Sequence, residues 1–144
     1  MSHTHFLYHV VFGTKDRLPL ISASWEDELF RYLGGIVKGH EGVPIAINGV
    51  ADHVHLLLRL KPVEKFSDFM RELKAGSSKW VKDKHEPTFS WGKRYGAFTV
   101  SESASRSVRR YIQMQKVHHG KLTFEEEYRK LLVLHNIDFE ERYL

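Results

Sequence analysis

The stretch "HVHLLLRL", residues 53–60, decides how this chain folds. Successive side chains of an extended strand point to opposite faces of a sheet, so this stretch has one wholly aliphatic face. That face consists of Val54, Leu56, Leu58 and Leu60. The other face carries His53 and His55, which a strand holds about 7 Å apart. The stretch therefore predicts a strand that buries one face in a core and presents two imidazoles on the other.

The residues before this strand show first a strand pattern and then a helix pattern. Residues 4–12, "THFLYHVVF", alternate and are rich in aromatic and β-branched residues, which predicts a strand. Ser24 predicts the N-cap of a helix, because acidic residues fill the first turn after it and Gly39 and Gly42 close the segment. The apolar face of this helix consists of Trp25, Leu29, Leu33, Ile36 and Val37.

A hairpin and a long helix come next. Residues 44–50 predict a strand that turns into the histidine strand either at Asn48–Gly49, a strong hairpin signal, or at Ala51–Asp52. Residues 66–84 predict a helix, because apolar residues recur there at helical spacing. Its core face consists of Phe66, Phe69, Met70, Leu73, Trp80 and Val81.

The last third of the chain predicts one more strand and two helices. The strand covers residues 97–101 and the first helix about 105–119. Thr123 and Glu126 form a capping box for a final helix, about 123–136. The order β-α-β-β-α-β followed by two helices predicts an α+β, ferredoxin-like split β-α-β fold with a four-stranded antiparallel sheet. Because this fold serves many functions, the side chains must indicate which one applies.

The composition narrows the class of protein. The 144 residues suit a single domain, 1–144, and 42% hydrophobic with 28% charged residues is typical of a soluble globular protein. The absence of cysteine excludes disulfides and thiolate metal sites, and we expect a cytoplasmic protein. Apolar runs are shorter than the roughly 20 residues of a membrane helix, and the N-terminus lacks a signal-peptide pattern. Lys and Arg exceed Asp and Glu by 22 to 18, which permits a polyanionic partner.

Tyr111 and Gln115 are four residues apart and therefore share one face of the helix predicted over 105–119. If that helix packs on the sheet, both side chains meet His53 and His55. Two imidazole nitrogens and an amide oxygen suit Mn²⁺, and also Mg²⁺ when water and phosphate supply the other ligands. Such an ion would neutralise a phosphate that a tyrosine oxygen attacks. A phenolate leaves readily, so the covalent product would be reversible.

Ordinary structural roles remain open for the same residues. Two half-buried histidines hydrogen-bonded to neighbours, and a tyrosine on the apolar face of a helix, would produce the same pattern. His118 and His119 stay ambiguous, because adjacent helical residues diverge by about 100°. His3 and His5 repeat the histidine spacing but lie at a terminus, where fraying is common.

An ordered set of motifs extends over most of the chain. These are "YHVVFGTKDRLPLI", "NGVADHVHLLLRL", "LKAGSSKWVKD", "RYGAFTVS", "YIQMQKVHH" and "TFEEEYRKLL". With them the chain resembles the single-tyrosine HUH transposases carried by insertion sequences of the 200/605 type. The letters HUH stand for histidine, a hydrophobic residue and histidine, which "HVH" matches.

The resemblance implies a site and a reaction. His53 and His55 would be metal ligands, Gln115 would complete the site for Mg²⁺ or Mn²⁺, and Tyr111 would be the nucleophile. The substrate would be single-stranded DNA with subterminal hairpins, cleaved and rejoined through a 5′-phosphotyrosine without a nucleotide cofactor. The resemblance also implies a homodimer, in which the tyrosine helix of one subunit can complete the site of the other. The Ser-rich stretch before that helix would be the hinge for this exchange. The resemblance further implies a prokaryotic protein that is associated with the nucleoid when it binds DNA.

Basic and aromatic residues outside this site are candidate DNA contacts. Trp91 and Tyr95 are candidates for stacking on unpaired bases. The candidate phosphate contacts are Lys15, Arg17, Arg71, Lys74, Lys79, Lys82, Lys93 and Arg94.

Three other functions compete with a transposase. A domesticated HUH nuclease that processes host repeat hairpins would have the same sequence pattern. A non-catalytic module that binds single-stranded nucleic acid is disfavoured, because such sheets usually carry aromatic residues where this chain has His53 and His55. A structural zinc protein is disfavoured because the chain has no cysteine and the cluster includes an amide oxygen.

Overall fold

Four antiparallel strands form one sheet in the computed structural model, which describes residues 3–120, 122–135 and 137. The strand order is β2-β3-β1-β4, so β3 and β1 are central, and β3 is the predicted histidine strand. This arrangement confirms the predicted fold class. The strands are β1 (Phe6–Gly13), β2 (Val43–Val50), β3 (His53–Leu60) and β4 (Gly96–Val100).

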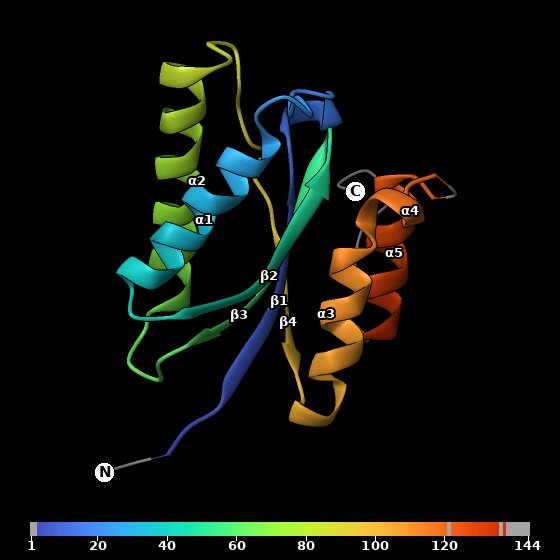
Figure 1. Ribbon diagram of the computed structural model, residues 1–144. Coiled ribbons are helices and arrows are strands. Elements are labelled where there is room, and N and C mark those ends of the chain that lie inside the picture. The colour runs from blue at the N-terminus through green and yellow to red at the C-terminus, as the bar shows by residue number, and fades with distance from the viewer. Residues whose placement is uncertain (1–2, 121, 136, 138–144) are drawn as a thin grey trace.

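Helices cover both faces of the sheet (Figure 1). One face carries α1 (Glu26–Gly39) and α2 (Phe66–Lys84). The other carries α3 (Ser105–Gln113), α4 (Gln115–His118) and α5 (Phe124–Leu134). Short 3-10 turns, Lys15–Arg17 and Glu102–Ala104, follow β1 and β4. Within the described residues, no helix combines the length and apolar character needed to cross a membrane.

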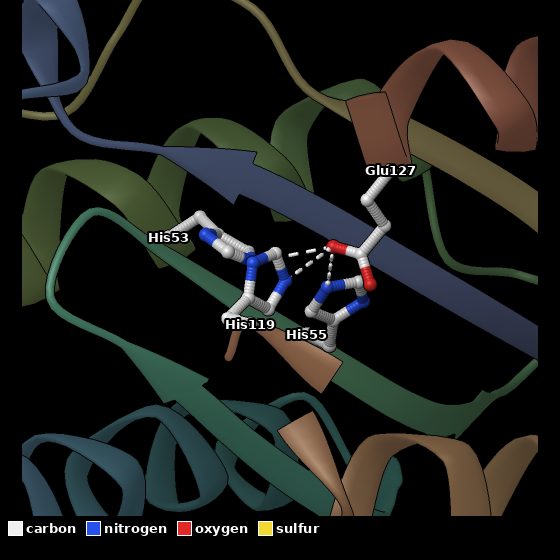
Figure 2. Close-up of side chains that lie close together, drawn as sticks. All are labelled: His53, His55, His119 and Glu127. Atoms are coloured by element: carbon white, nitrogen blue, oxygen red, sulfur yellow. Dashed lines mark hydrogen bonds and ion pairs between the residues drawn. The ribbon is translucent and has the colours of Figure 1, made fainter. Parts of the chain in front are cut away.

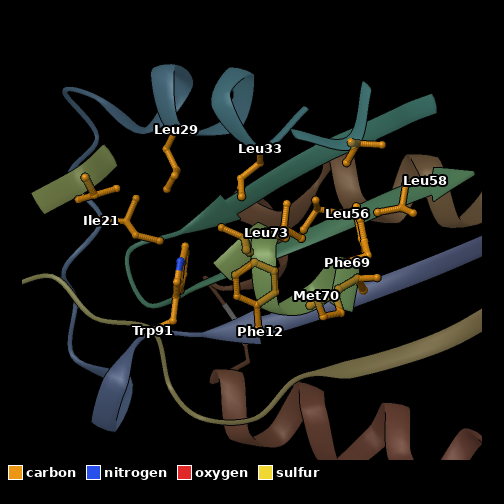
Figure 3. Close-up of a cluster of buried hydrophobic side chains, with 14 of the residues drawn as sticks. Phe12, Ile21, Leu29, Leu33, Leu56, Leu58, Phe69, Met70, Leu73 and Trp91 are labelled. Carbon is orange, nitrogen blue, oxygen red and sulfur yellow. The ribbon is translucent and has the colours of Figure 1, made fainter. Parts of the chain in front are cut away.

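The main hydrophobic core lies between the sheet and the α1–α2 layer (Figure 3). The aliphatic face predicted for β3 is fully part of it. Trp91 is buried there against Phe12 and Phe89, and its ring nitrogen donates to the Ser77 hydroxyl at 2.9 Å. The prediction that Trp91 stacks on DNA bases is therefore wrong, because its ring is packed inside the hydrophobic core. Tyr95 stays 37% exposed.

Two smaller apolar clusters attach the C-terminal helices to the opposite face. Val11, Phe98 and Leu132 form one, which holds α5. Ala46, Leu57 and Ile112 form the other, which holds α3. His53 and His55 lie on this same face and are completely buried. The C-terminal helices thus turn the polar half of β3 into the floor of an interior site.

The start of the first helix differs from the prediction, and the structure decides between the two positions considered for the hairpin turn. Helix α1 begins at Glu26, and the Ser24 hydroxyl lies 2.9 Å from the Ser22 hydroxyl instead of capping the helix. The β2–β3 turn is at Ala51–Asp52, the second of the two positions considered. Gly49 lies within β2, where a Cβ atom would be only 2.4 Å from the carbonyl oxygen of His53. The glycine is thus required for close strand approach rather than for a turn.

The predicted helix over 105–119 is broken at Met114 into α3 and α4. Asn48 of β2 explains the break, because its side-chain amide donates to the carbonyls of Ile112 (3.0 Å) and Gln113 (3.1 Å). In a continuous helix those two carbonyls would accept bonds from backbone N–H groups four residues later. The final helix agrees with prediction over Phe124–Leu134, and residue 136 lies outside the described residues.

Candidate active site

Strand β3 directs His53 and His55 toward the C-terminal helices, with their ring centroids 5.2 Å apart (Figure 2). Neither side chain is exposed to solvent. Each ring is held on its far side by a polar neighbour. Nδ1 of His53 lies 2.7 Å from an Asp52 carboxylate oxygen, and Nδ1 of His55 lies 2.8 Å from Nε2 of His9. Both rings therefore present Nε2 to the same interior point.

Glu127 of α5 occupies the centre of the site and is only 2% exposed. Its Oε1 lies 2.9 Å from Nε2 of His55, 3.0 Å from Nε2 of His119 and 3.2 Å from Nε2 of His53. Figure 2 shows the three imidazoles directed at this one oxygen. His119 follows α4 directly as its C-cap residue.

The second carboxylate oxygen of Glu127 faces the tyrosine helix. The Tyr111 hydroxyl donates to Oε2, and the Gln115 side-chain amide donates to the same atom at 3.0 Å. The amide oxygen of Gln115 lies 3.4 Å from Nε2 of His53. The four residues predicted to meet over the sheet thus do meet, and each contacts Glu127.

The electrostatics of the site keep Glu127 ionised. Burial alone would raise the pKa of its carboxyl group, but hydrogen bonds with His53 and His55 lower that pKa to about 2. Burial acts to lower the pKa of His53, yet its hydrogen bonds to Asp52 and Glu127 raise it overall. The cluster is therefore organised around one buried negative charge.

The other imidazoles of the site favour their neutral forms. Burial lowers the pKa of His55. Burial and the nearby His55 lower the pKa of His9 to about 3, while burial and the nearby His53 lower that of His119 to about 4. Neutral imidazoles carry a free nitrogen lone pair, which is the form that binds metals.

Four side chains of this site fit a divalent ion. His53, His55, His119 and Glu127 each offer one ligand atom, and these atoms all lie within 4.8 Å of one another. Imidazole nitrogen and carboxylate oxygen are ordinary ligands of divalent metals. The site can thus combine a metal with a tyrosine hydroxyl in one buried place.

Sequence reasoning missed Glu127, Asp52, His9 and the role of His119. Three consecutive acidic residues begin α5, and only the packing of that helix selects the third of them. The choice between His118 and His119 is likewise made by packing, since His118 stacks on Tyr111 instead, with ring centroids 4.6 Å apart. Asp52 was visible in the sequence as the carboxylate next to His53.

Part of the predicted basic set lines a groove next to the site. The groove encloses about 320 Å³ and includes Arg17, Lys93, Arg94 and the ring of Phe124. Phe124 stacks on His53, with ring centroids 4.1 Å apart. The groove therefore leads to the outer side of the histidine pair, and exposed Lys15 lies beside it in the same turn as Arg17.

The remaining basic candidates lie on α2, across the sheet from the histidines. Arg71 pairs with Asp68 at 3.0 Å, and Lys79 pairs with Asp83 at 2.9 Å. Lys82 is exposed. Lys74 is half-buried and donates to the carbonyl of Gly92 at 2.6 Å, so it supports the loop that carries Lys93 and Arg94.

Comparisons with known proteins show which family this chain resembles. The family described as "Transposase IS200 like" matches residues 2–115. The ISDra2 transposase TnpA of Deinococcus radiodurans is 29% identical over 115 residues, which cover 75% of this chain and 82% of the relative.

Two solved structures are also similar to this chain. A transposase from Deinococcus radiodurans R1 has a TM-score of 0.62 and 27% identity, and the match covers 79% of this chain and 93% of that one. A REP-associated tyrosine transposase bound to a REP hairpin has a TM-score of 0.64 and 16% identity, over 85% of this chain and 74% of that one. At this identity the second likeness shows the fold alone.

Proposed function

The chain belongs to the IS200-like transposase family, and from this premise we propose that it cleaves and rejoins single-stranded DNA by using Tyr111 as its nucleophile. One observation carries the proposal. The half-buried Tyr111 lies against a buried cluster of histidines and a carboxylate, and its hydroxyl donates to Glu127. A tyrosine with an ordinary structural role does not need such surroundings. A tyrosine that attacks a phosphodiester needs positive charge at the phosphate, which a metal ion held by this cluster would supply.

In the proposed reaction the Tyr111 hydroxyl loses its proton, its oxygen attacks phosphorus, and the bond to the 3′ oxygen breaks as that oxygen takes up a proton. The strand then ends in a free 3′-hydroxyl, and the other fragment is joined to the enzyme as a 5′-phosphotyrosine. Attack by a 3′-hydroxyl on this linkage releases the tyrosine and restores a phosphodiester. Because one phosphodiester replaces another at each step, no nucleotide cofactor is required.

We propose that His53, His55 and Gln115 hold a divalent ion, Mg²⁺ or Mn²⁺. When bound, the ion supplies positive charge to the phosphate that is attacked. The protein's own contribution is to orient the ligands. Asp52 fixes the ring of His53, and His9 fixes that of His55. Outer partners of this kind commonly set the orientation of ligating imidazoles.

The substrate is proposed to be DNA with hairpins near the cleavage site. Support comes from the groove lined by Arg17, Lys93 and Arg94, which ends at the ring stacked on His53. The REP-associated relative was solved bound to a REP hairpin. Basic side chains along such a groove provide salt-dependent phosphate contacts. We propose action as a homodimer, on DNA of the nucleoid in a prokaryotic cytoplasm.

The proposal is tested with labelled single-stranded oligonucleotides from the flanks of the gene. Purified protein with Mn²⁺ or Mg²⁺ should form a protein–DNA adduct that survives denaturing electrophoresis. Tyr111→Phe should form none while still binding the DNA. Tyr32→Phe is the matched control, because Tyr32 stacks on Trp80 in the α1–α2 layer, and it should form the adduct normally.

Other outcomes would point to the competing functions. Adduct formation by Tyr111→Phe would refute the assigned nucleophile. Binding of hairpin DNA without any adduct, with either metal, would favour a non-catalytic binding module. An adduct formed with host repeat hairpins but not with the flanks of the gene would favour a domesticated nuclease.

A further inference from the structure

We infer that His119 and Glu127 bind the same ion as His53 and His55, so that the centre is a three-histidine, one-carboxylate site that selects a transition-metal ion such as Mn²⁺ over Mg²⁺. The inference deepens the proposed function and rests on its metal site. His119 and Glu127 lie beyond residues 2–115, the part of the chain that the family matches. The family match therefore does not account for these two residues.

The spacing of the four side chains supports a shared ion. Two ligand atoms that are each about 2.1 Å from a metal lie about 3.0 Å apart at a right angle and about 3.4 Å apart at the tetrahedral angle. The Glu127 Oε1 atom lies 2.9, 3.0 and 3.2 Å from the Nε2 atoms of His55, His119 and His53. These three separations match neighbouring ligands around one centre, and all four ligand atoms lie within 4.8 Å of one another, so small side-chain shifts bring them onto one ion.

Hydrogen bonding accounts for the contact between His53 and Glu127 only when both ring nitrogens of His53 are protonated. An ionised carboxylate only accepts hydrogen bonds, so Nδ1 of His53 must donate to Asp52 at 2.7 Å. In a neutral ring the Nε2 atom then carries a lone pair that faces the Glu127 oxygen at 3.2 Å. Two lone pairs at this distance repel each other. A cation between them makes both contacts favourable.

The other two imidazoles are oriented in the same way. The Nδ1 atom of His55 lies 2.8 Å from Nε2 of His9, and when it donates there the Nε2 lone pair of His55 faces Glu127. His119 has a backbone hydrogen bond with Leu122, and its Nε2 atom is the one that faces Glu127. An outer partner on one nitrogen and a metal on the other is the usual arrangement of ligating histidines.

The kind of ligand indicates the kind of ion. Mg²⁺ prefers oxygen ligands and retains several waters, whereas imidazole nitrogen suits later divalent ions such as Mn²⁺, Co²⁺ and Zn²⁺. Among these four residues Glu127 gives the single oxygen ligand, and the Gln115 amide of the proposed function adds one more, so nitrogen ligands still predominate. The site should therefore retain a transition-metal ion when Mg²⁺ is present in large excess.

The competing arrangement contains no metal. His53 would be an imidazolium ion paired with Glu127, and Glu127 would keep metals away from the histidines. The two arrangements predict opposite effects of removing the Glu127 charge. If Glu127 is a ligand, its removal weakens metal binding, and if it is a competitor, its removal strengthens binding.

The experiment titrates the full-length protein, without DNA, with Co²⁺ and with Mn²⁺. Visible absorption follows Co²⁺ and electron paramagnetic resonance follows free Mn²⁺, each with and without a thousandfold excess of Mg²⁺. Glu127→Gln and His119→Ala should each raise the dissociation constant at least about tenfold, a loss comparable with that for outer partners of metal ligands. The matched controls, Glu125→Gln on the same helix and His118→Ala beside His119, should stay within about twofold.

A readout on the wild-type protein avoids the risk that a variant fails to fold. Proton nuclear magnetic resonance of the Co²⁺-loaded protein should show three paramagnetically shifted, exchangeable imidazole N–H signals. A spectrum with only two such signals would overturn this inference and leave the proposed metal site standing. The same holds if Glu127→Gln and His119→Ala bind the metal as the wild-type protein does while His55→Ala no longer binds it. Tighter binding by Glu127→Gln would also overturn it. A wild-type protein that binds neither ion would refute the metal requirement of the proposed function itself.

Discussion

Replacing Gly49 by alanine should disturb the fold and the candidate site together. Gly49 pairs with Val54 in the β2–β3 ladder, next to the pair formed by Val50 and His53. A Cβ atom at position 49 would lie 2.4 Å from the carbonyl oxygen of His53 and 3.0 Å from the Cα atom of Val54. Both atoms belong to the backbone, so no side chain can rotate away to make room.

The size of the effect follows from that distance. Real Cβ contacts are essentially never shorter than 3.0 Å, so the 2.4 Å approach requires the strands to separate by at least 0.6 Å, the difference between the two. Forcing an extra methyl group into a packed interior typically costs about 1–3 kcal/mol. At about 4 °C per kcal/mol for a domain of this size, the melting temperature should fall by roughly 4–12 °C. Because the shift moves the backbone of His53, metal binding should weaken as well.

Thermal melting and urea unfolding, followed by circular dichroism, measure the stability of this variant. The matched control is Gly35→Ala in α1, where an added Cβ atom has nothing within 4 Å. Removing a helical glycine should increase the free energy of unfolding by about 0.5–1 kcal/mol. The reasoning would be refuted if Gly49→Ala were as stable as the wild-type protein, or if both variants shifted in the same direction.

Three further predictions concern the parts around the site. Asn48→Ala removes two hydrogen bonds to the end of α3 and should lower the free energy of unfolding by about 1–2 kcal/mol in urea titrations. An unchanged midpoint would show that these two hydrogen bonds do not stabilise the fold. Thr123→Ala removes the capping box of α5 and should cost about 1 kcal/mol, measured in the same way, whereas Thr123→Ser should recover most of it. Lys93→Gln should weaken binding of single-stranded DNA and reduce the slope of log K against log salt by about 0.7. Fluorescence anisotropy at several salt concentrations measures this slope, and a slope equal to that of the wild-type protein would exclude a phosphate contact.

Much of the fold was predictable because local patterns and tertiary packing agree. The alternation in β3 identifies its core face, and the helical spacing of apolar residues gives α2 over Phe66–Lys84, the predicted bounds. The meeting of Tyr111 and Gln115 with the histidine pair was also predicted from local periods, and it holds although the helix that carries Tyr111 and Gln115 is broken between them at Met114. The roles of these side chains in metal binding and catalysis remain predictions.

The remainder depends on contacts between distant parts of the chain. Nothing near Met114 in the sequence ends a helix. The side-chain amide that donates hydrogen bonds to the last carbonyls of α3 comes from Asn48, more than sixty residues earlier. Glu127 is one of three adjacent acidic residues on α5, and it becomes the buried one because α5 packs on β1 and β4 through Val11 and Phe98. Such choices are made by the assembled fold, so a single sequence does not reveal them.

The break at Met114 also determines which parts of the site can move separately. Tyr111 lies on α3, before the break, whereas Gln115 and His119 lie after it and contact Glu127. In the proposed reaction, a rotation about Met114 would carry Tyr111 and the DNA strand attached to it away from the sheet, while Gln115 and His119 keep their contacts with Glu127. The proposed metal centre would then be free to receive a second phosphate before the first strand is released, so attachment and release would be separate events within one turnover.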